Sequence, residues 1–184
     1  IAIGVSALLV SGTAPAVAET RQAAGAAGAE AIGAQGHEPR KGPLRSVAPK
    51  GFAIGAAAAG GGHHLEQDYP DPFTHDKKYR EVLAKHFNSL TPENQLKWEF
   101  VHPARNRYNF GPADAIVRFA QQHGQKVRGH TLLWHSQNPK WLTEGKFSKK
   151  ELRKILKDHI TTVVGRYRGK IHQWDVANEI FDDN

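Results

Sequence analysis

The sequence contains no cysteine and no methionine. Without cysteine, neither a disulfide framework nor a cysteine-ligated zinc site can form. The absence of cysteine does not indicate a cellular compartment, because secretion permits disulfides but does not require them. A translated chain normally begins with methionine, so we expect that a further segment precedes Ile1.

Blocks of five consecutive like charges are also absent, although the formal net charge is +7. Basic residues exceed acidic ones in residues 19–50 and again in residues 51–184, without clustering. A basic balance makes a nucleic-acid partner worth testing, but scattered charge is more typical of a solvated surface. We therefore expect no nucleic-acid partner.

No apolar run reaches the roughly 20 residues that span a bilayer. The apolar residues 1–10 are followed by Ala16-Val17-Ala18, the small-x-small pattern of a signal-peptidase site. We interpret residues 1–18 as a partial signal peptide and expect a secreted, extracellular protein that is not bound to a membrane. The alternative is a buried strand or helix near the terminus.

Residues 19–50 have few large apolar side chains. They are rich in Ala and Gly, and Pro39, Pro43 and Pro49 lie near their end. Such a composition cannot bury much of a core, so we expect a disordered linker. The pattern changes at Gly51, and the folded domain is predicted to occupy residues 51–184.

Strand-like and helix-like segments alternate from Gly51 onward. Apolar runs predict four strands, at residues 52–57, 88–91, 125–133 and 171–176. Helical spacing predicts three helices, at residues 76–87, from Pro112 to Gly124, and from the capping box Ser148-x-x-Glu151 to Gly165.

The expected inward faces of these helices are Tyr79, Val82, Leu83 and Phe87 in the first, Ile116, Phe119 and Ala120 in the second, and Leu152, Ile155, Leu156, Ile160 and Val163 in the third. Strands that alternate with helices predict an α/β fold with a parallel sheet and helices outside it. A doubly wound sheet and a (β/α)8 barrel both fit this order. No Gly-x-Gly-x-x-Gly or Walker-type turn opens a helix, which disfavours a nucleotide-binding doubly wound sheet.

Polar and aromatic residues follow three of the predicted strands, where parallel α/β folds place their sites. They are Glu93, Asn94, Lys97 and Trp98 after the second strand, His130, Trp134, His135 and Gln137 after the third, and Asn178 and Glu179 after the fourth. Carboxylates, amides and a lysine suit sugar hydroxyls, and tryptophan faces suit pyranose rings.

Side-chain alternation adds an expectation about the third strand. Arg128, His130, Leu132 and Trp134 would share one face, so that His130 and Trp134 address the same cavity. Asp175 is interpreted as a strand residue or as a carboxylate that supports the site. His63-His64 resembles a metal pair only weakly, and we expect no metal and no cofactor.

Three segments resemble the strand motifs of glycoside hydrolase family 10. Residues 87–99 (FNSLTPENQLKWE) are similar to its second-strand motif, residues 127–137 (VRGHTLLWHSQ) to its third, and residues 174–179 (WDVANE) to its fourth. The resemblance implies a (β/α)8 TIM barrel of which about the first four β/α units are present. It also implies a retaining endo-1,4-β-xylanase that acts on xylan and xylo-oligosaccharides and is a monomer at full length.

The resemblance also implies roles for single residues. Glu179 would be the general acid/base, and Asn178 would hold the 2-hydroxyl of the sugar at the cleavage point. His130 and Trp134 would line that subsite, and Glu93, Asn94 and Lys97 would bind the next sugar toward the non-reducing end. Gln137 and His135 would support these residues.

A retaining glycosidase needs two carboxyl groups about 5–5.5 Å apart. The family's nucleophile lies on a later strand, so we expect it beyond Asn184 and expect this chain alone to be inactive. Three alternatives remain open: a β-1,4-glucanase or aryl-glycosidase of the same fold, a non-catalytic carbohydrate-binding barrel, and a nucleic-acid-binding protein. The presence of Asn178-Glu179 disfavours the non-catalytic barrel.

We predict poor solubility for residues 51–184 in isolation, because an unclosed half barrel exposes strand edges and its interior face. Expression of this segment followed by size-exclusion chromatography and thermal melting tests the prediction. A soluble monomer that melts cooperatively would contradict it.

Overall fold

The computed structural model describes residues 41–60 and 71–181. The predicted signal peptide, residues 19–40 of the predicted linker and the pair His63-His64 lie outside these ranges. No helix within the two described ranges combines the length and the apolar character needed to span a bilayer.

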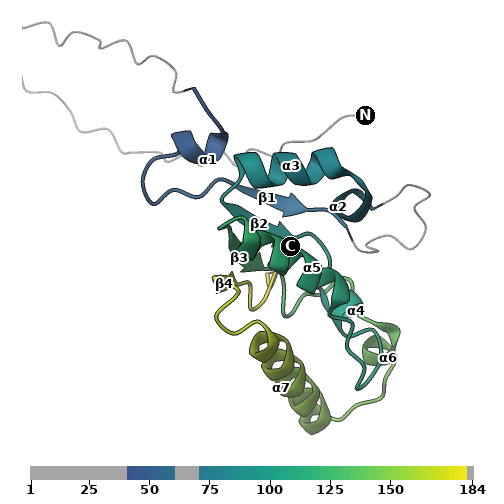
Figure 1. Cartoon of the computed structure of the whole chain (residues 1–184). Coiled ribbons are helices and arrows are strands. Elements are labelled where there is room, and N and C mark those ends of the chain that lie inside the picture. The colour runs from purple at the N-terminus through teal and green to yellow at the C-terminus, as the bar shows by residue number, and fades with distance from the viewer. Residues whose placement is uncertain (1–40, 61–70, 182–184) are drawn as a thin grey trace, which may run out of the picture. The chain divides into compact units, whose positions relative to one another are not determined.

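Four parallel strands form one sheet (Figure 1). They are β1 (Gly55–Ala58), β2 (Ser89–Pro92), β3 (Lys126–Gly129) and β4 (Gln173–Trp174). Their spatial order β1-β2-β3-β4 equals their order along the chain, and every neighbouring pair is parallel. A doubly wound sheet would reverse direction at a switch point. The one-directional order therefore favours the barrel wall over the doubly wound sheet.

The strands occupy the predicted places; β1, β3 and β4 are shorter than predicted, whereas β2 has the predicted length and is shifted by one residue. β1 begins at Gly55 rather than at residue 52, and β3 ends at Gly129 rather than at residue 133. Beyond Gly129 single backbone bonds continue toward β4: Leu132 N donates to Asp175 O at 3.0 Å, and Asn178 N donates to Leu133 O at 2.9 Å. The segments after β3 and β4 are thus irregular, but backbone hydrogen bonds hold them together.

The three predicted helices are confirmed as α3 (Lys77–His86), α5 (Gly111–Gln122) and α7 (Lys149–Arg166). Asp76 caps α3, because its Oδ1 accepts a bond from Tyr79 N at 3.0 Å. Gly124 follows α5 with a φ of +61°, a conformation that glycine adopts without steric cost. Four further helices of four residues each are too short to show periodicity in the sequence: α1 (Leu44–Val47), α2 (Pro72–His75), α4 (Trp98–Val101) and α6 (Lys140–Thr143).

Helix α1 lies inside the range that we expected to be a disordered linker. Arg45 ties it to the domain, since one of its terminal nitrogens donates to Ala84 O at 3.1 Å and to His123 O at 3.0 Å. These carbonyls belong to α3 and to the end of α5. The expectation of a disordered linker therefore does not hold for residues 44–47.

The two faces of the sheet differ in chemistry. Leu90 and Val127 are buried in the apolar core, whereas Ser89, Thr91 and Arg128 line an open cavity. This is the alternation that a strand imposes on its side chains. Helix α5 contacts both β2 and β3. The apolar face thus packs against helices, and the polar face lines the open cavity, as expected for the interior of a barrel wall.

Two residues predicted to face inward are exposed. Val82 is 41% exposed in α3, and Leu152 is 43% exposed in α7. The buried row of α7 runs at intervals of four through His159 and Val163 and continues to Tyr167. Leu152 lies about 60° around the helix from Ile155, which shares the angular position of that row. The apolar pattern identified the helices correctly but made their inward stripes too broad.

The predicted capping box opens α7. Ser148 Oγ accepts a bond from Glu151 N at 3.3 Å, and the Glu151 carboxylate accepts one from Ser148 N at 2.8 Å. These contacts satisfy backbone donors that the helix itself cannot pair.

Replacing this cap should destabilise the protein. Ser148→Ala leaves the Glu151 N–H without its acceptor and should lower the free energy of unfolding by about 1 kcal/mol. Urea denaturation followed by circular dichroism measures the change. Thr162→Ala on the exposed side of α7 is the control, and an equal loss in both variants would contradict the capping role.

Candidate functional site

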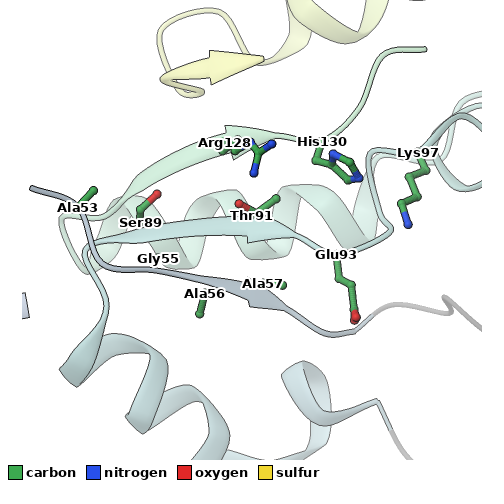
Figure 2. A pocket seen from close by; sticks show the side chains of 10 residues that line it. All are labelled: Ala53, Gly55, Ala56, Ala57, Ser89, Thr91, Glu93, Lys97, Arg128 and His130. Atoms are coloured by element: carbon green, nitrogen blue, oxygen red, sulfur yellow. The ribbon is translucent and has the colours of Figure 1, made fainter. Parts of the chain in front are cut away.

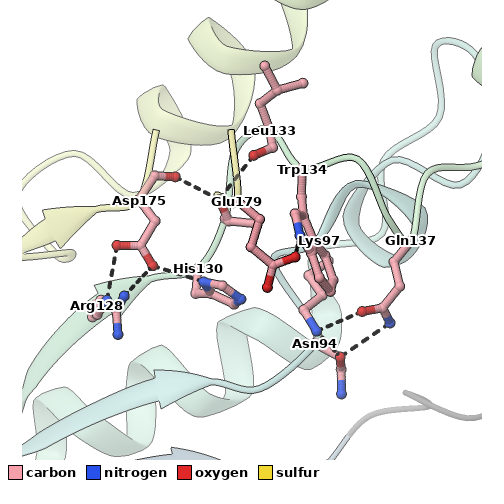
Figure 3. Close-up of polar contacts among 10 residues, drawn as sticks. Asn94, Lys97, Arg128, His130, Leu133, Trp134, Gln137, Asp175 and Glu179 are labelled. Atoms are coloured by element: carbon pink, nitrogen blue, oxygen red, sulfur yellow. Dashed lines mark hydrogen bonds and ion pairs between the residues drawn. The ribbon is translucent and has the colours of Figure 1, made fainter. Parts of the chain in front are cut away.

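The predicted site residues lie where β2, β3 and β4 end. The structure brings most of them together at this edge of the sheet (Figure 3), namely Asn94, Lys97, His130, Trp134, Gln137 and Glu179. The carboxyl ends of parallel strands are where this fold class places its binding groups. These six residues therefore lie near one another, and their roles in a site remain predictions.

The ammonium group of Lys97 joins the segment after β2 to the segment after β3. Lys97 Nζ donates to Asn94 Oδ1 at 2.6 Å and to Gln137 Oε1 at 2.7 Å. Gln137 Nε2 also donates to Asn94 Oδ1, at 3.3 Å. Asn94 is only 4% exposed, so its amide is a fixed acceptor rather than a mobile surface group. The three side chains thus hold one another in a single arrangement.

The same ammonium lies over an aromatic ring. Lys97 Nζ is 4.8 Å from the centroid of the Trp134 indole, within the range of a cation–π interaction. Burial lowers the pKa of Lys97, while the carboxylates of Glu93 and Glu179 act in the opposite direction. Lys97 is therefore the positive charge shared by both predicted carboxylates of the site.

Trp134 connects this cluster to Glu179. Its indole Nε1 donates to Glu179 Oε2 at 2.7 Å. His135 Nε2 lies 3.7 Å from the same oxygen, and the Glu179 side chain is 57% exposed. The carboxyl group is thus held from one side and open to solvent on another, as a group that must reach a ligand requires.

The backbone around Glu179 is constrained. A strand-like bridge joins Trp134 and Asn178, and Asn178 N donates to Leu133 O at 2.9 Å. Glu179 itself has a φ of +50°, as does Gln137. A non-glycine residue in this region costs on the order of 1–3 kcal/mol and is typical of functional sites. Asn178 enters the site through these backbone contacts.

His130 belongs to a second polar group beside the first. Its Nδ1 is 2.8 Å from Asp175 Oδ2, and Arg128 pairs with both Asp175 oxygens at 3.0 and 2.7 Å. A carboxylate paired with arginine can only accept, so His130 Nδ1 carries the proton of this bond and Nε2 remains available to a ligand. The His130 and Trp134 rings are 6.4 Å apart, centroid to centroid.

A cavity of about 600 Å³ opens along the polar face of the sheet (Figure 2). At the strand ends it is lined by Glu93, Lys97 and His130. Figure 2 shows these three side chains around the ends of β2 and β3. Glu93 thus shares this space with Lys97 and His130, whereas Trp134 and Glu179 lie beyond its lining.

The predicted neighbourhood of His130 and Trp134 is found, but the reason given for it is wrong. Side-chain alternation requires a continuous strand, and β3 ends at Gly129. Leu132, predicted to share their face, is 2% exposed and packs in the apolar core. The irregular chain after Gly129, rather than strand parity, brings the two rings together.

The ion pair between Arg128 and Asp175 was not predicted from the sequence. Arg128 stands two residues before His130, and Asp175 follows directly after Trp174 of β4. The parallel register pairs Arg128 with Gln173, so that Asp175, two residues further along, lies diagonally opposite Arg128. Only the pairing of strands 45 residues apart could reveal this contact.

Comparison with known proteins identifies the family. Residues 44–184 match the sequence model described as glycosyl hydrolase family 10. The chain belongs to this family. The expected (β/α)8 barrel is thereby confirmed, with four of its strands in the described residues.

Several known xylanases are similar to this chain in sequence or structure. The chain is 50% identical over 141 residues to a β-1,4-xylanase of Dictyoglomus thermophilum, which covers 77% of this chain and 36% of that protein. Xylanase 10B of Thermotoga maritima aligns with a TM-score of 0.67 at 44% identity, over 77% of this chain and 41% of its own. Xylanase 10B of Thermotoga petrophila, solved with xylobiose, aligns with a TM-score of 0.66 at 40% identity, over 79% and 42%.

The chain therefore spans about two fifths of the length of these family 10 relatives. Among the described residues, no group of three or more His, Cys, Asp or Glu side chains could hold a metal ion. The candidate site in this part of the barrel consists of the carboxylates, amides and aromatic side chains described above.

Proposed function

We propose that the complete protein to which this chain belongs is an endo-1,4-β-xylanase. It would hydrolyse internal β-1,4-xylosidic bonds of xylan by a retaining double displacement. Membership of family 10 and the xylanase names of its relatives support this. The observation that carries the proposal is the contact of Glu179 with Trp134, beside the Asn94, Lys97 and Gln137 cluster.

In this reaction Glu179 is the general acid/base. It first protonates the glycosidic oxygen of the leaving sugar, and it later takes a proton from the water that hydrolyses the covalent intermediate. Both steps require a carboxyl group that is oriented yet accessible. The indole bond orients Glu179, and its open side can face the substrate. The nucleophile would come from the second half of the barrel.

The other site residues bind sugar in this proposal. Asn178 holds the 2-hydroxyl at the cleavage point, and hydrogen bonds there that strengthen in the transition state lower the barrier. His130 offers Nε2, and Trp134 offers its indole face. Glu93, Asn94 and Lys97 bind the next sugar toward the non-reducing end, and Gln137 positions the Lys97 ammonium.

We further propose that the protein is exported and acts as a monomer outside the cell. Xylan is a polymer too large to enter a cell, so its hydrolysis must begin outside. The apolar residues 1–10 followed by Ala16-Val17-Ala18 support a signal peptide. Residues 19–40 would then connect the cleavage site to the barrel.

The acid/base role predicts a dependence on the leaving group. In the complete enzyme, Glu179→Gln should reduce xylan hydrolysis by about 10²–10⁴-fold, since a general acid contributes that much. The glycosylation step on a dinitrophenyl xylobioside should change little, because a good leaving group needs no proton. Pre-steady-state kinetics measures that step separately.

The matched control is Glu144→Gln, an exposed glutamate at the end of α6. It should leave both reactions unchanged. If Glu179→Gln lowered the glycosylation rate equally on xylan and on the dinitrophenyl xylobioside, the assigned role would be contradicted. A higher rate on carboxymethylcellulose than on xylan in the unmodified enzyme would instead favour a glucanase.

The binding role of Lys97 predicts a dependence on chain length. Lys97→Met should raise KM for xylotetraose about tenfold, because one charge-assisted hydrogen bond contributes on the order of 1.4 kcal/mol. An aryl xyloside, which does not reach the second sugar position, should be nearly unaffected. Lys85→Met, an exposed change in α3, is the control, and equal effects on both substrates would contradict the role.

A further inference from the structure

Behind the sugar site lies a group of stacked rings that the proposed reaction does not use. We name it the aromatic stack, and its members are Trp98, His102, Tyr108, Trp141 and His159. His159 stacks on Trp98 with centroids 3.9 Å apart, and His102 stacks on Tyr108 at 4.0 Å. The rings come from α4 with the chain that follows it, from α6 and from α7, so the stack joins three separate segments.

At its centre two imidazoles face each other. His102 Nδ1 and His159 Nδ1 are 3.2 Å apart, so one ring donates a hydrogen bond to the other. His159 is fully buried and His102 is 5% exposed. Within the described residues neither Nε2 has a hydrogen-bond partner. The contact requires one protonated and one unprotonated Nδ1, which two neutral rings provide.

The stack touches both sides of the sugar site. Trp98 follows directly after Lys97, at the start of α4. On the other side, the backbone carbonyl of Leu132, midway between His130 and Trp134, interacts with the His159 ring. The segment that carries Lys97 and the segment that carries Trp134 therefore both contact His159, through Trp98 and through Leu132.

We propose that His102 and His159 are positioning residues that hold Lys97 and Trp134 in their sugar-binding arrangement and release it when the pair is protonated. The proposal rests on the sugar-binding role of these two residues given above. The geometry supports it in one respect. A first added proton goes to an Nε2 that is buried behind the site, and protonation of both rings would place two N–H groups 3.2 Å apart, facing each other.

The surroundings give a protonated pair little support. A cavity of about 110 Å³ beside His102 is lined by four charged residues: Arg105 from the chain after α4, and Glu151, Lys154 and Asp158 from α7. Asp158 is paired with Lys154 at 2.7 Å, and the Glu151 carboxylate accepts a hydrogen bond from Ser148 N. Tyr108 and Trp141 are the other polar rings in contact with His102.

Burial accordingly disfavours the charged forms of both rings. The pKa of His159 is lowered to about 3, mainly by burial and also by the neighbouring His102, while the Leu132 carbonyl acts in the opposite direction. Burial also lowers the pKa of His102. Once the stack opens, each imidazole regains its ordinary pKa near 6.5.

The direction of the pH effect follows from these values. The closed arrangement is fully favoured above about pH 6.5 and loses its advantage as the pH falls toward 3, because the open state binds more protons. Between pH 7 and pH 5, His159 alone should raise the ratio of open to closed molecules about 25-fold. Titration of His102 adds to this ratio.

Hydrogen exchange on the complete enzyme tests the proposal. Exchange rates of peptides from residues 98–110 and 149–166, corrected for intrinsic pH dependence, should rise by at least about 25-fold from pH 7 to pH 5. The Kd of xylotriose for the catalytically impaired Glu179→Gln enzyme should rise over the same pH range. Exchange in α3, residues 77–86, should not follow this transition.

A double variant, His102→Asn with His159→Asn, places an amide where each Nδ1 stood and cannot titrate. It should abolish the pH dependence of exchange and of Kd. His75→Asn, an exposed histidine in α2, is the matched control and should retain both. If the double variant does not fold, the pH series on the unmodified pair decides alone.

Unchanged exchange of residues 149–166 between pH 7 and pH 5 would overturn the proposal. So would a rise in exchange without any change in Kd, because the stack would then not position the sugar site. Failure to bind xylotriose even at pH 7 would instead contradict the sugar-binding function. The two failures are therefore distinguishable.

Discussion

The arrangement of the site depends on one partly buried ammonium group. Burial lowers the pKa of Lys97, and the amides of Asn94 and Gln137 provide acceptors for its hydrogen bonds. The position of this charge places it over the ring of Trp134, whose indole N–H in turn holds Glu179. A continuous series of polar contacts thus joins the three segments that follow β2, β3 and β4. The charge-assisted bonds of Lys97 favour one relative placement of the segments after β2 and β3, and the separate bond from Trp134 orients Glu179.

Much of this could be predicted from the sequence. Alternating apolar runs and helical spacing located all four strands and the three long helices, since these patterns report burial over many residues. The chemistry after each strand end, with Glu93 and Lys97, then Trp134, then Glu179, identified the edge where the site lies. The capping box at Ser148 was also visible, because its two partners are three residues apart.

What the sequence did not reveal involves contacts between distant segments. Arg128 meets Asp175 only because β3 and β4 pair in one register, and His102 meets His159 only because α7 packs beside α4. A histidine on the buried row of a helix carries no local signal of its partner. The early end of β3 at Gly129 was hidden for a similar reason, because the apolar run continues to Leu133 while the strand pairing does not. Helix α1 is held by Arg45, whose acceptors lie about 40 and 80 residues away.

The central claim is that Glu179 is the proton donor to the glycosidic bond. A crystal structure of the complete protein with an intact xylo-oligosaccharide across the cleavage point tests this most directly. The account predicts the Glu179 carboxyl within hydrogen-bonding distance, about 2.6–3.2 Å, of the glycosidic oxygen, with the sugar on the other side of the bond near Lys97 and Asn94. A glycosidic oxygen that lies against a different carboxyl group, with Glu179 turned to solvent, would contradict it.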